Sequence, residues 1–93
     1  MLTFTKDGWA EYVSWQNEDR KTLKKINNLI QSIEREGPMS GEGQPEKLKA
    51  MPNTYSRKID KENRLIYIAL SGNYTVTACK EHYDDNKPKK AKS

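Results

Sequence analysis

The pair Gly37-Pro38 divides this sequence of 93 residues into two parts with different hydrophobic periods. Before the pair, apolar residues recur every three or four positions, which is the period of an amphipathic helix. The clearest stripe consists of Leu23, Ile26, Ile30 and Ile33. Glycine supplies the left-handed conformation that ends many helices, and proline cannot continue one. A helix ending at this pair is therefore predicted, and the residues after it follow the period of strands.

The first part predicts a short strand followed by two helices. Residues 1–5 alternate in the manner of a strand. Thr5 or Asp7 can cap a first helix, and residues 17–19 offer a new N-cap for the second. One face of the first helix carries Trp9, Tyr12, Val13 and Gln16. Trp15 lies off that face, where it belongs either to the core or to a partner interface.

The second part predicts strands joined by short turns, which implies antiparallel neighbours. Residues 55–60 alternate between polar and apolar, and residues 74–81 form a last strand. Residues 64–70 are apolar on both faces, which is typical of a central strand covered on two sides. We therefore expect an α+β fold in which an N-terminal strand and an αα-hairpin pack on a mainly antiparallel, four- to five-stranded sheet.

Charge and composition exclude several classes. Seventeen basic against thirteen acidic residues give a net charge of +4, and half of this surplus falls in residues 84–93. That lysine-rich segment has little to bury and is predicted to be a disordered tail beyond a domain of residues 1–83. No apolar run approaches the roughly 20 residues of a spanning helix, and no secretory signal is visible. A lone Cys79 suits the reducing cytoplasm.

Three groups of residues could carry chemistry. Glu46 follows a proline in a glycine-rich approach, Arg57-Lys58 and Arg64 lie in consecutive strands, and His82 and Tyr83 end the last strand. RNA cleavage needs a base for the 2′-OH, a cation for the phosphate and an acid for the leaving oxygen. With one histidine and one cysteine, a zinc site is not expected. We thus expect catalysis by side chains alone, with neither metal nor cofactor.

Each of these residues also has a plain structural explanation. Glu46 alone is a typical solvated carboxylate. Arg57 and Arg64 fit cross-strand salt bridges equally well, and His82 fits an ordinary strand end. The residues by themselves leave both interpretations open.

The sequence resembles the YoeB branch of the RelE-like toxins from bacterial type II toxin–antitoxin pairs, over about residues 2–83. The resemblance rests on six ordered blocks at family-like spacing, and no single block would be specific. They are Trp9-x-x-Tyr12-x-x-Trp15-Gln16, Lys24-Lys25-Ile26-Asn27-x-Leu29-Ile30, Gly41-x-Gly43-x-Pro45-Glu46-x-Leu48-Lys49, Tyr55-Ser56-Arg57-Lys58-Ile59, Arg64-Leu65-Ile66-Tyr67 and Ala78-Cys79-Lys80-x-His82-Tyr83.

The resemblance implies a RelE-like fold and a ribosome-dependent endoribonuclease that cuts mRNA in the decoding site. By this resemblance Glu46 looks like the general base, Arg64 the phosphate and transition-state stabiliser, and His82 the general acid with Tyr83 positioning RNA beside it. Basic positions that face the RNA backbone correspond to Lys49, Arg57 and Lys58. The implied partners are a cognate antitoxin, the ribosome with bound mRNA, and a second copy in a homodimer or a toxin–antitoxin hetero-oligomer; no membrane is implied.

The sequence departs from the family pattern at three places. Lys58 replaces a common second arginine, which removes bidentate phosphate contact there. Asn63 replaces a common histidine, and ten residues follow Tyr83. Two alternatives stay open: a toxin of the same fold acting on another target such as DNA gyrase, and a noncatalytic RNA-binding module.

Overall fold

The computed structural model describes residues 1–80. They form two helices, α1 (Lys6–Glu18) and α2 (Arg20–Glu36). The five strands are β1 (Leu2–Phe4), β2 (Glu46–Lys47), β3 (Thr54–Lys58), β4 (Arg64–Leu70) and β5 (Asn73–Ala78). His82, Tyr83 and the predicted tail of residues 84–93 lie outside the described residues.

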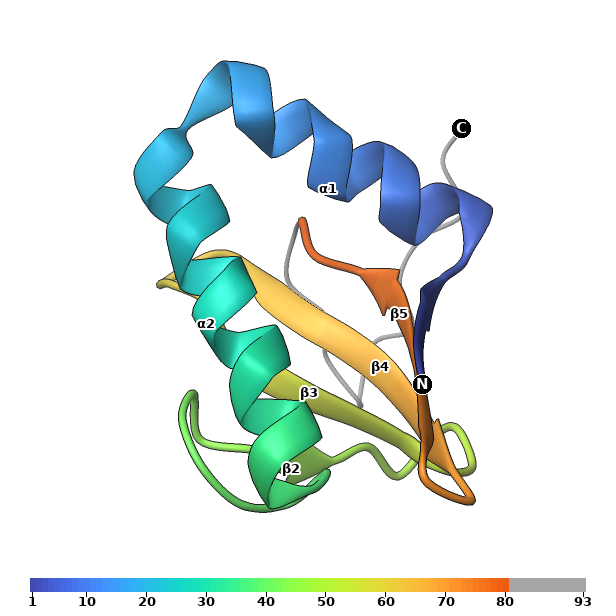
Figure 1. The fold of residues 1–93 in the computed structure, drawn as a ribbon. Coiled ribbons are helices and arrows are strands. Elements are labelled where there is room, and N and C mark those ends of the chain that lie inside the picture. Colours follow the sequence, from blue (N-terminus) through green and yellow to red (C-terminus); the bar gives the residue numbers. More distant parts are fainter. Residues whose placement is uncertain (81–93) are drawn as a thin grey trace.

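All five strands belong to one sheet in the order β1-β5-β4-β3-β2. Strand β1 runs parallel to β5, and the other neighbours are antiparallel. Strand β4 is therefore central, as its apolar sequence predicts. The two helices diverge from their junction and lie on the same side of the sheet (Figure 1). This arrangement confirms the predicted α+β class, with an N-terminal strand and two helices packed on a mainly antiparallel five-stranded sheet.

Local capping explains where the helices begin and end. The hydroxyl of Thr5 accepts a hydrogen bond of 3.0 Å from the N–H of Gly8 at the start of α1. Asp19 ends α1 and caps α2, where its carboxylate accepts hydrogen bonds from Lys21 and Thr22. Hydrogen bonds from Thr22 to this carboxylate lower the pKa of Asp19. Gly37 ends α2 with a φ of 92°, as the glycine-proline pair predicts.

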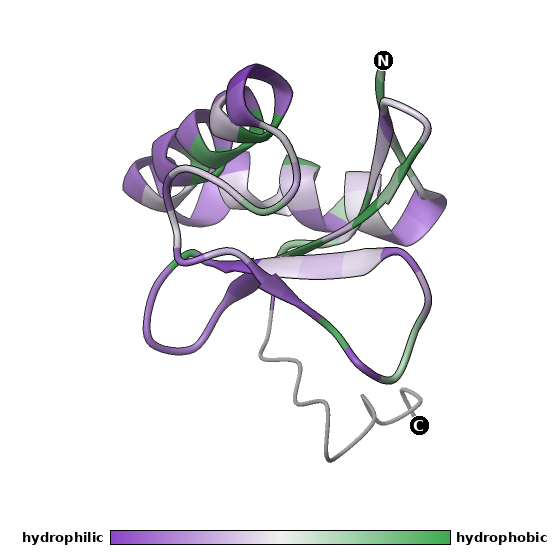
Figure 2. Cartoon of the chain, turned by 90° about the horizontal axis from the view of Figure 1, so that it is seen from below, coloured by the Kyte–Doolittle hydropathy of each residue, from purple (hydrophilic) through white to green (hydrophobic). Residues whose placement is uncertain are grey.

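The core lies between α2 and the sheet. From α2 it contains the buried residues Ile26, Leu29, Ile30 and Ile33, which confirms most of the predicted stripe. Leu65, Tyr67 and Val76 meet them from β4 and β5, and all three are fully buried. Figure 2 shows hydrophilic and hydrophobic residues alternating along α2, as expected of a helix with one covered face.

The predicted buried face of α1 is wrong by part of a turn. Trp9 is 52% exposed, whereas Trp15 is 7% exposed and belongs to the core. The reason is Gly8, since a Cβ built on it would lie 2.4 Å from the carbonyl oxygen of Val76. Helix α1 approaches β5 closely through Gly8, and Trp15, seven residues later, faces the sheet in turn.

The last strand is shorter than predicted. It ends at Ala78 rather than at residue 81, because side chains of α1 bind the backbone of the next two residues. Neither of the two described helices combines the length and the apolar character that crossing a membrane requires.

Candidate active site

The face of the sheet opposite the helices gathers several predicted site residues. Residues paired across neighbouring strands project to the same face, as do residues two apart on one strand. Glu46 pairs with Ser56, and Lys58 pairs with Arg64. Because Ser56 and Lys58 are two apart on β3, Glu46, Lys58 and Arg64 share one face. This face is called the open face below.

An ion pair joins two of these residues. Arg64 Nη1 lies 3.7 Å from Glu46 Oε1. The Glu46 side chain is 61% exposed and that of Arg64 is 24% exposed. A pair with this much exposure stabilises a fold by only about 0–1 kcal/mol. The juxtaposition therefore has little value for stability, and it places a carboxylate and a guanidinium where a ligand can reach both.

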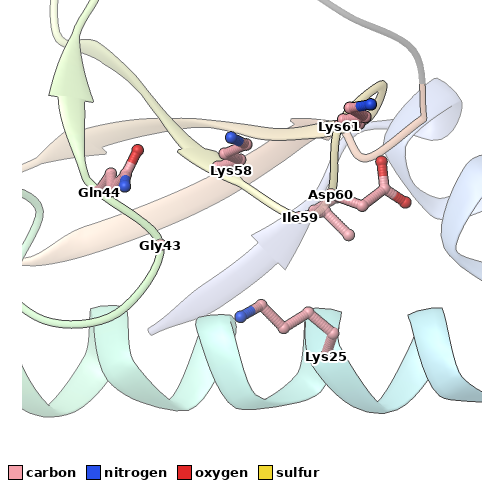
Figure 3. Close-up of a pocket in the computed structure, with 7 residues that line it drawn as sticks. All are labelled: Lys25, Gly43, Gln44, Lys58, Ile59, Asp60 and Lys61. Atoms are coloured by element: carbon pink, nitrogen blue, oxygen red, sulfur yellow. The ribbon is translucent and has the colours of Figure 1, made fainter.

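The two lysines predicted to bind RNA, Lys49 and Lys58, are accessible to solvent. Lys49 and Lys58 are both exposed, Lys49 just after β2 and Lys58 at the end of β3. Lys58 also lines a cavity of about 310 Å³ with Lys25 and Lys61 (Figure 3). Both lysines have the accessibility that contact with an RNA backbone requires.

Asp60 moderates the charge of that cavity, which it also lines. Burial pushes its pKa up, but hydrogen bonds from the Asn63 side chain and from the N–H groups of Glu62 and Asn63 prevail. The pKa of Asp60 therefore lies below its ordinary value. The Asp60 carboxylate is therefore ionised at neutral pH, next to the lysines that line the same cavity.

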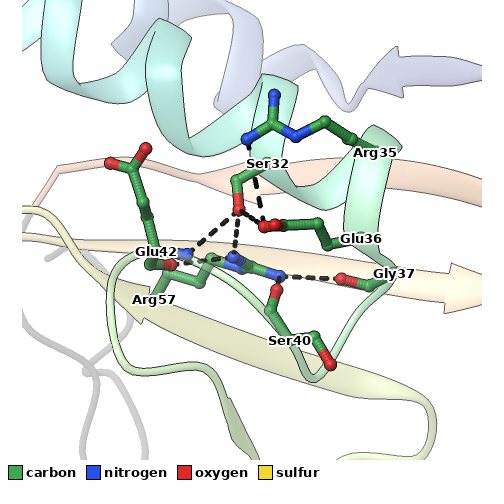
Figure 4. Close-up of polar contacts among 7 residues, drawn as sticks. All are labelled: Ser32, Arg35, Glu36, Gly37, Ser40, Glu42 and Arg57. Carbon is green, nitrogen blue, oxygen red and sulfur yellow. Dashed lines mark hydrogen bonds and ion pairs between the residues drawn. The ribbon is translucent and has the colours of Figure 1, made fainter.

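The prediction that Arg57 faces RNA is corrected by its burial. Arg57 is 0% exposed, and its side chain points toward α2 and the loop that follows α2 (Figure 4). Its neighbour Lys58 is the exposed residue of the pair. Strand alternation is the physical reason, since residues 57 and 58 must face opposite sides of the sheet. Arg57 therefore has no access to a ligand on the open face.

Helix α1 holds the backbone that leads to His82 and Tyr83. Glu11 Oε1 accepts hydrogen bonds from the N–H groups of Cys79 (2.8 Å) and Lys80 (3.0 Å). Trp15 Nε1 donates to the carbonyl of Cys79 at 2.9 Å. The Lys80 ammonium donates to the Glu18 carboxylate and lies 5.0 Å from the Trp15 ring centroid. The chain is thus fixed two residues before His82.

Two further residues, Ser56 and Glu11, are missing from the sequence-based predictions. Ser56 Oγ is buried beside Glu46, and among the described residues it is the one buried side-chain polar atom without a hydrogen-bond partner. Nothing in the sequence marks it. Glu11 does leave a signal, because it lies on the same helix face as Gly8 and Trp15. A carboxylate on a buried face requires hydrogen-bond donors, and the chain after β5 supplies them.

Both the sequence and the fold match known proteins. A family model described as the YoeB-like toxin of bacterial type II toxin–antitoxin systems matches residues 4–83. This chain belongs to the YoeB-like toxin family. Toxin YoeB of Streptomyces coelicolor is 41% identical over 83 residues, which cover 88% of this chain and 98% of the relative. The resemblance expected from the sequence is confirmed.

Solved YoeB structures agree with the fold as well. The YoeB dimer of Staphylococcus aureus superposes with a TM-score of 0.83 at 41% identity and covers 88% of this chain and 95% of its own. The heterotetrameric YoeB-YefM complex of the same organism gives a TM-score of 0.82 at 40% identity, covering 89% of this chain and 97% of that one. In the described part of this YoeB-like chain, no three histidine, cysteine or acidic residues come together as a metal site.

Proposed function

We propose that this YoeB-like toxin is a ribosome-dependent endoribonuclease that cleaves mRNA in the ribosomal A site and thereby inhibits translation. The observation that carries the proposal is the pairing of Glu46 with Arg64 on the open face. A solvated carboxylate beside a partly covered guanidinium supplies two of the three groups that transesterification of RNA requires. Membership of the YoeB-like family supports the same reaction class.

In the proposed reaction Glu46 accepts the proton of a ribose 2′-OH. The 2′ oxygen then forms a bond to phosphorus as the bond from phosphorus to the 5′ oxygen breaks. His82 donates a proton to the departing oxygen, and Tyr83 positions the RNA beside it. Arg64 donates hydrogen bonds to the phosphate oxygens as they gain charge. The products are a 2′,3′-cyclic phosphate and a 5′-hydroxyl, and no metal or cofactor takes part.

The RNA backbone is proposed to lie across Lys49 and Lys58. Both side chains are exposed; Lys58 shares the face of Glu46, and Lys49 lies three residues after Glu46. Lysine binds phosphate as a point charge rather than in a fixed fork, so these contacts hold RNA without selecting its sequence. Arg57 takes no part in RNA binding in this proposal, because it is buried.

The proposed partners follow from the same family. YoeB of Staphylococcus aureus forms a dimer and a heterotetramer with YefM. We propose by analogy that this chain forms a homodimer or a hetero-oligomer with a cognate antitoxin, and that it works in the cytoplasm, where ribosomes translate.

The test is cleavage of a synthetic mRNA by the purified protein with and without programmed ribosomes. Cleavage that requires ribosomes and that stops when the antitoxin is added is the expected result. Binding of RNA without any cleavage would contradict the proposal and favour a noncatalytic module. Loss of gyrase supercoiling activity, with mRNA left intact, would favour a toxin with another target.

A further inference from the structure

The loop between α2 and β2 is held by buried side chains although its sequence is flexible. Its three glycines, Gly37, Gly41 and Gly43, have positive φ values of 92°, 101° and 87°. Such a loop has much conformational entropy to lose. It ends at Glu46, the proposed general base. The contacts that fix this loop therefore also fix the position at which the chain reaches Glu46.

Arg57 binds three carbonyl groups of this loop. Its Nη2 donates to the carbonyls of Gly37 (2.7 Å) and Ser40 (2.6 Å), and its Nη1 donates to that of Glu42 (2.8 Å). The other two bonds go to hydroxyls, from Nη1 to Ser32 (3.0 Å) and from Nε to Tyr67 (2.9 Å). A guanidinium has five N–H donors. All five are used, and Arg57 is 0% exposed.

The hydroxyls of Ser32 and Tyr67 make further hydrogen bonds. Ser32 Oγ donates to Glu36 Oε1 at 2.8 Å and accepts from the N–H of Glu42 at 3.0 Å in addition to the Arg57 bond. That uses the full capacity of a hydroxyl. Tyr67 Oη donates to the carbonyl of Pro38 at 2.6 Å. Figure 4 shows Ser32 of α2 and Arg57 of β3 converging on this loop, and Tyr67 of β4 joins them through its bond to Pro38.

This loop leads directly into β2 and is bonded to the end of β3. The N–H of Lys58 donates to the carbonyl of Gly43 at 2.7 Å, which joins the loop to the end of β3. Strand β2 has only two residues and pairs with β3 at two positions. So short a strand gives Glu46 little support of its own. The position of Glu46 beside Arg64 therefore depends in part on the loop before it.

We propose that Arg57, with Ser32 and Tyr67, is a latch that positions Glu46 for catalysis without touching RNA. The inference rests on the proposed role of Glu46 as general base. It assigns Arg57 a positioning role on the helix side of the sheet, while Glu46 works on the open face. A displacement of about 1 Å at a reacting group can cost roughly 100-fold in rate, so loosening the latch lowers kcat more than it raises KM.

The test uses Tyr67→Phe and Ser32→Ala, because replacing the buried Arg57 itself can prevent folding. Tyr67→Phe keeps the ring and removes only the hydroxyl, and Tyr55→Phe is the matched control. The Tyr55 ring stacks on Tyr67 at 5.8 Å, but its hydroxyl makes no hydrogen bond to the loop in the described chain. We expect about a tenfold lower kcat for Tyr67→Phe and Ser32→Ala at an unchanged KM, and parental rates for Tyr55→Phe.

A double-mutant cycle with Glu46→Ala separates positioning from general destabilisation. If the latch acts through Glu46, Tyr67→Phe has no further effect once Glu46 is gone. Hydrogen exchange of the Glu42 amide should also become faster in Ser32→Ala while core amides stay protected. Additive losses in the cycle, or an unchanged kcat in both latch variants, would overturn the inference. If Glu46→Ala itself cleaves at the parental rate, the proposed function fails instead, and the two failures are thereby distinguished.

Discussion

Glu46 and Arg64 carry opposite charges on the open face, and the proposed mechanism gives them different tasks. The carboxylate is the more exposed of the two, which suits a group that must reach a ribose hydroxyl. The guanidinium is the less exposed of the two, and the proposed mechanism gives it the task of binding the phosphate. A surface ion pair of this kind contributes little to the free energy of unfolding. We therefore expect its role to be in the proposed reaction.

Replacing Glu46 by Ala is expected to lower cleavage of ribosome-bound mRNA by at least about tenfold, the low end of what a positioned proton carrier contributes. His82→Ala should lower it to a similar extent. Glu34→Ala, on the exposed side of α2, is the control and should cleave normally. Parental rates for both active-site variants would show that the roles are assigned wrongly.

Tyr67 leads to a prediction about alkaline pH. Burial raises the pKa of Tyr67, although the neighbouring Arg57 opposes the shift. A raised pKa means that the folded state holds the proton more tightly than the unfolded state does. Stability from this proton is complete below the ordinary tyrosine pKa of about 10 and is lost as pH rises beyond it. Urea unfolding from pH 8 to 11 should show a smaller loss for Tyr67→Phe than for Tyr55→Phe, and equal losses would refute it.

For single residues, the sequence shows which side chains could take part in catalysis or bind phosphate, and the resemblance assigns their roles. It does not by itself say which of two adjacent cations faces a ligand. The alternation of residues 55–60 places Arg57 with Tyr55 and Ile59 on the covered side, so the signal for its burial exists. A charge on an apolar face is a sign of buried acceptors, and here those acceptors are loop carbonyls distant in sequence.

Helix α1 is the element that connects the core with the C-terminal segment. Its Gly8 allows close contact with β5, its Trp15 enters the core, and its Glu11 binds the backbone after β5. Periodicity predicts the helix and its cap but not the rotation of the helix about its axis. That rotation is decided by which residue permits the closest approach, and a single glycine outweighs the large apolar surface of Trp9.

Substitution of Glu11 by Ala tests the contact between this helix and the chain before His82. It leaves two part-buried N–H groups without their acceptor, and such groups cost about 1–3 kcal/mol each at full burial. We expect the free energy of unfolding to fall by about 1–2 kcal/mol in urea titrations. Cleavage should fall as well, because His82 is two residues beyond the contact.

Glu18→Ala is the matched control for that substitution. Glu18 bonds the same Lys80 through its side chain, but at 51% exposure. Loss of such a surface pair should cost less than about 1 kcal/mol. A larger loss of stability in Glu18→Ala than in Glu11→Ala would contradict the proposed anchoring by Glu11.

In the whole molecule, the sheet brings together strands that are far apart in sequence. The short connections of the second half correctly predict antiparallel neighbours, and the central position of residues 64–70 follows from their composition. The parallel pairing of β1 with β5 has no local signal, because its partners are about 70 residues apart. The open face likewise depends on sheet order, so the residues alone indicate only that Glu46 and Arg64 can meet, and the resemblance assigns them to one site.

The distribution of charge over the molecule gives a prediction for RNA binding. Residues 84–93 hold four lysines and two aspartates, half of the net charge of +4. Removing them should weaken binding to single-stranded RNA and make its salt dependence shallower, by up to about three in the slope of log K against log salt. Fluorescence anisotropy at several salt concentrations measures this. An unchanged or steeper slope would contradict the prediction and mean that these lysines do not contribute to RNA binding.

The most direct test of the central claim is to map mRNA 5′ ends in a translating extract after the purified protein is added. The account predicts new 5′ ends at a constant position within codons of translated reading frames, carrying 5′-hydroxyl groups. They should be absent without translating ribosomes and absent with Glu46→Ala. Cuts scattered without regard to reading frame, or cuts of equal yield on naked RNA, would contradict it.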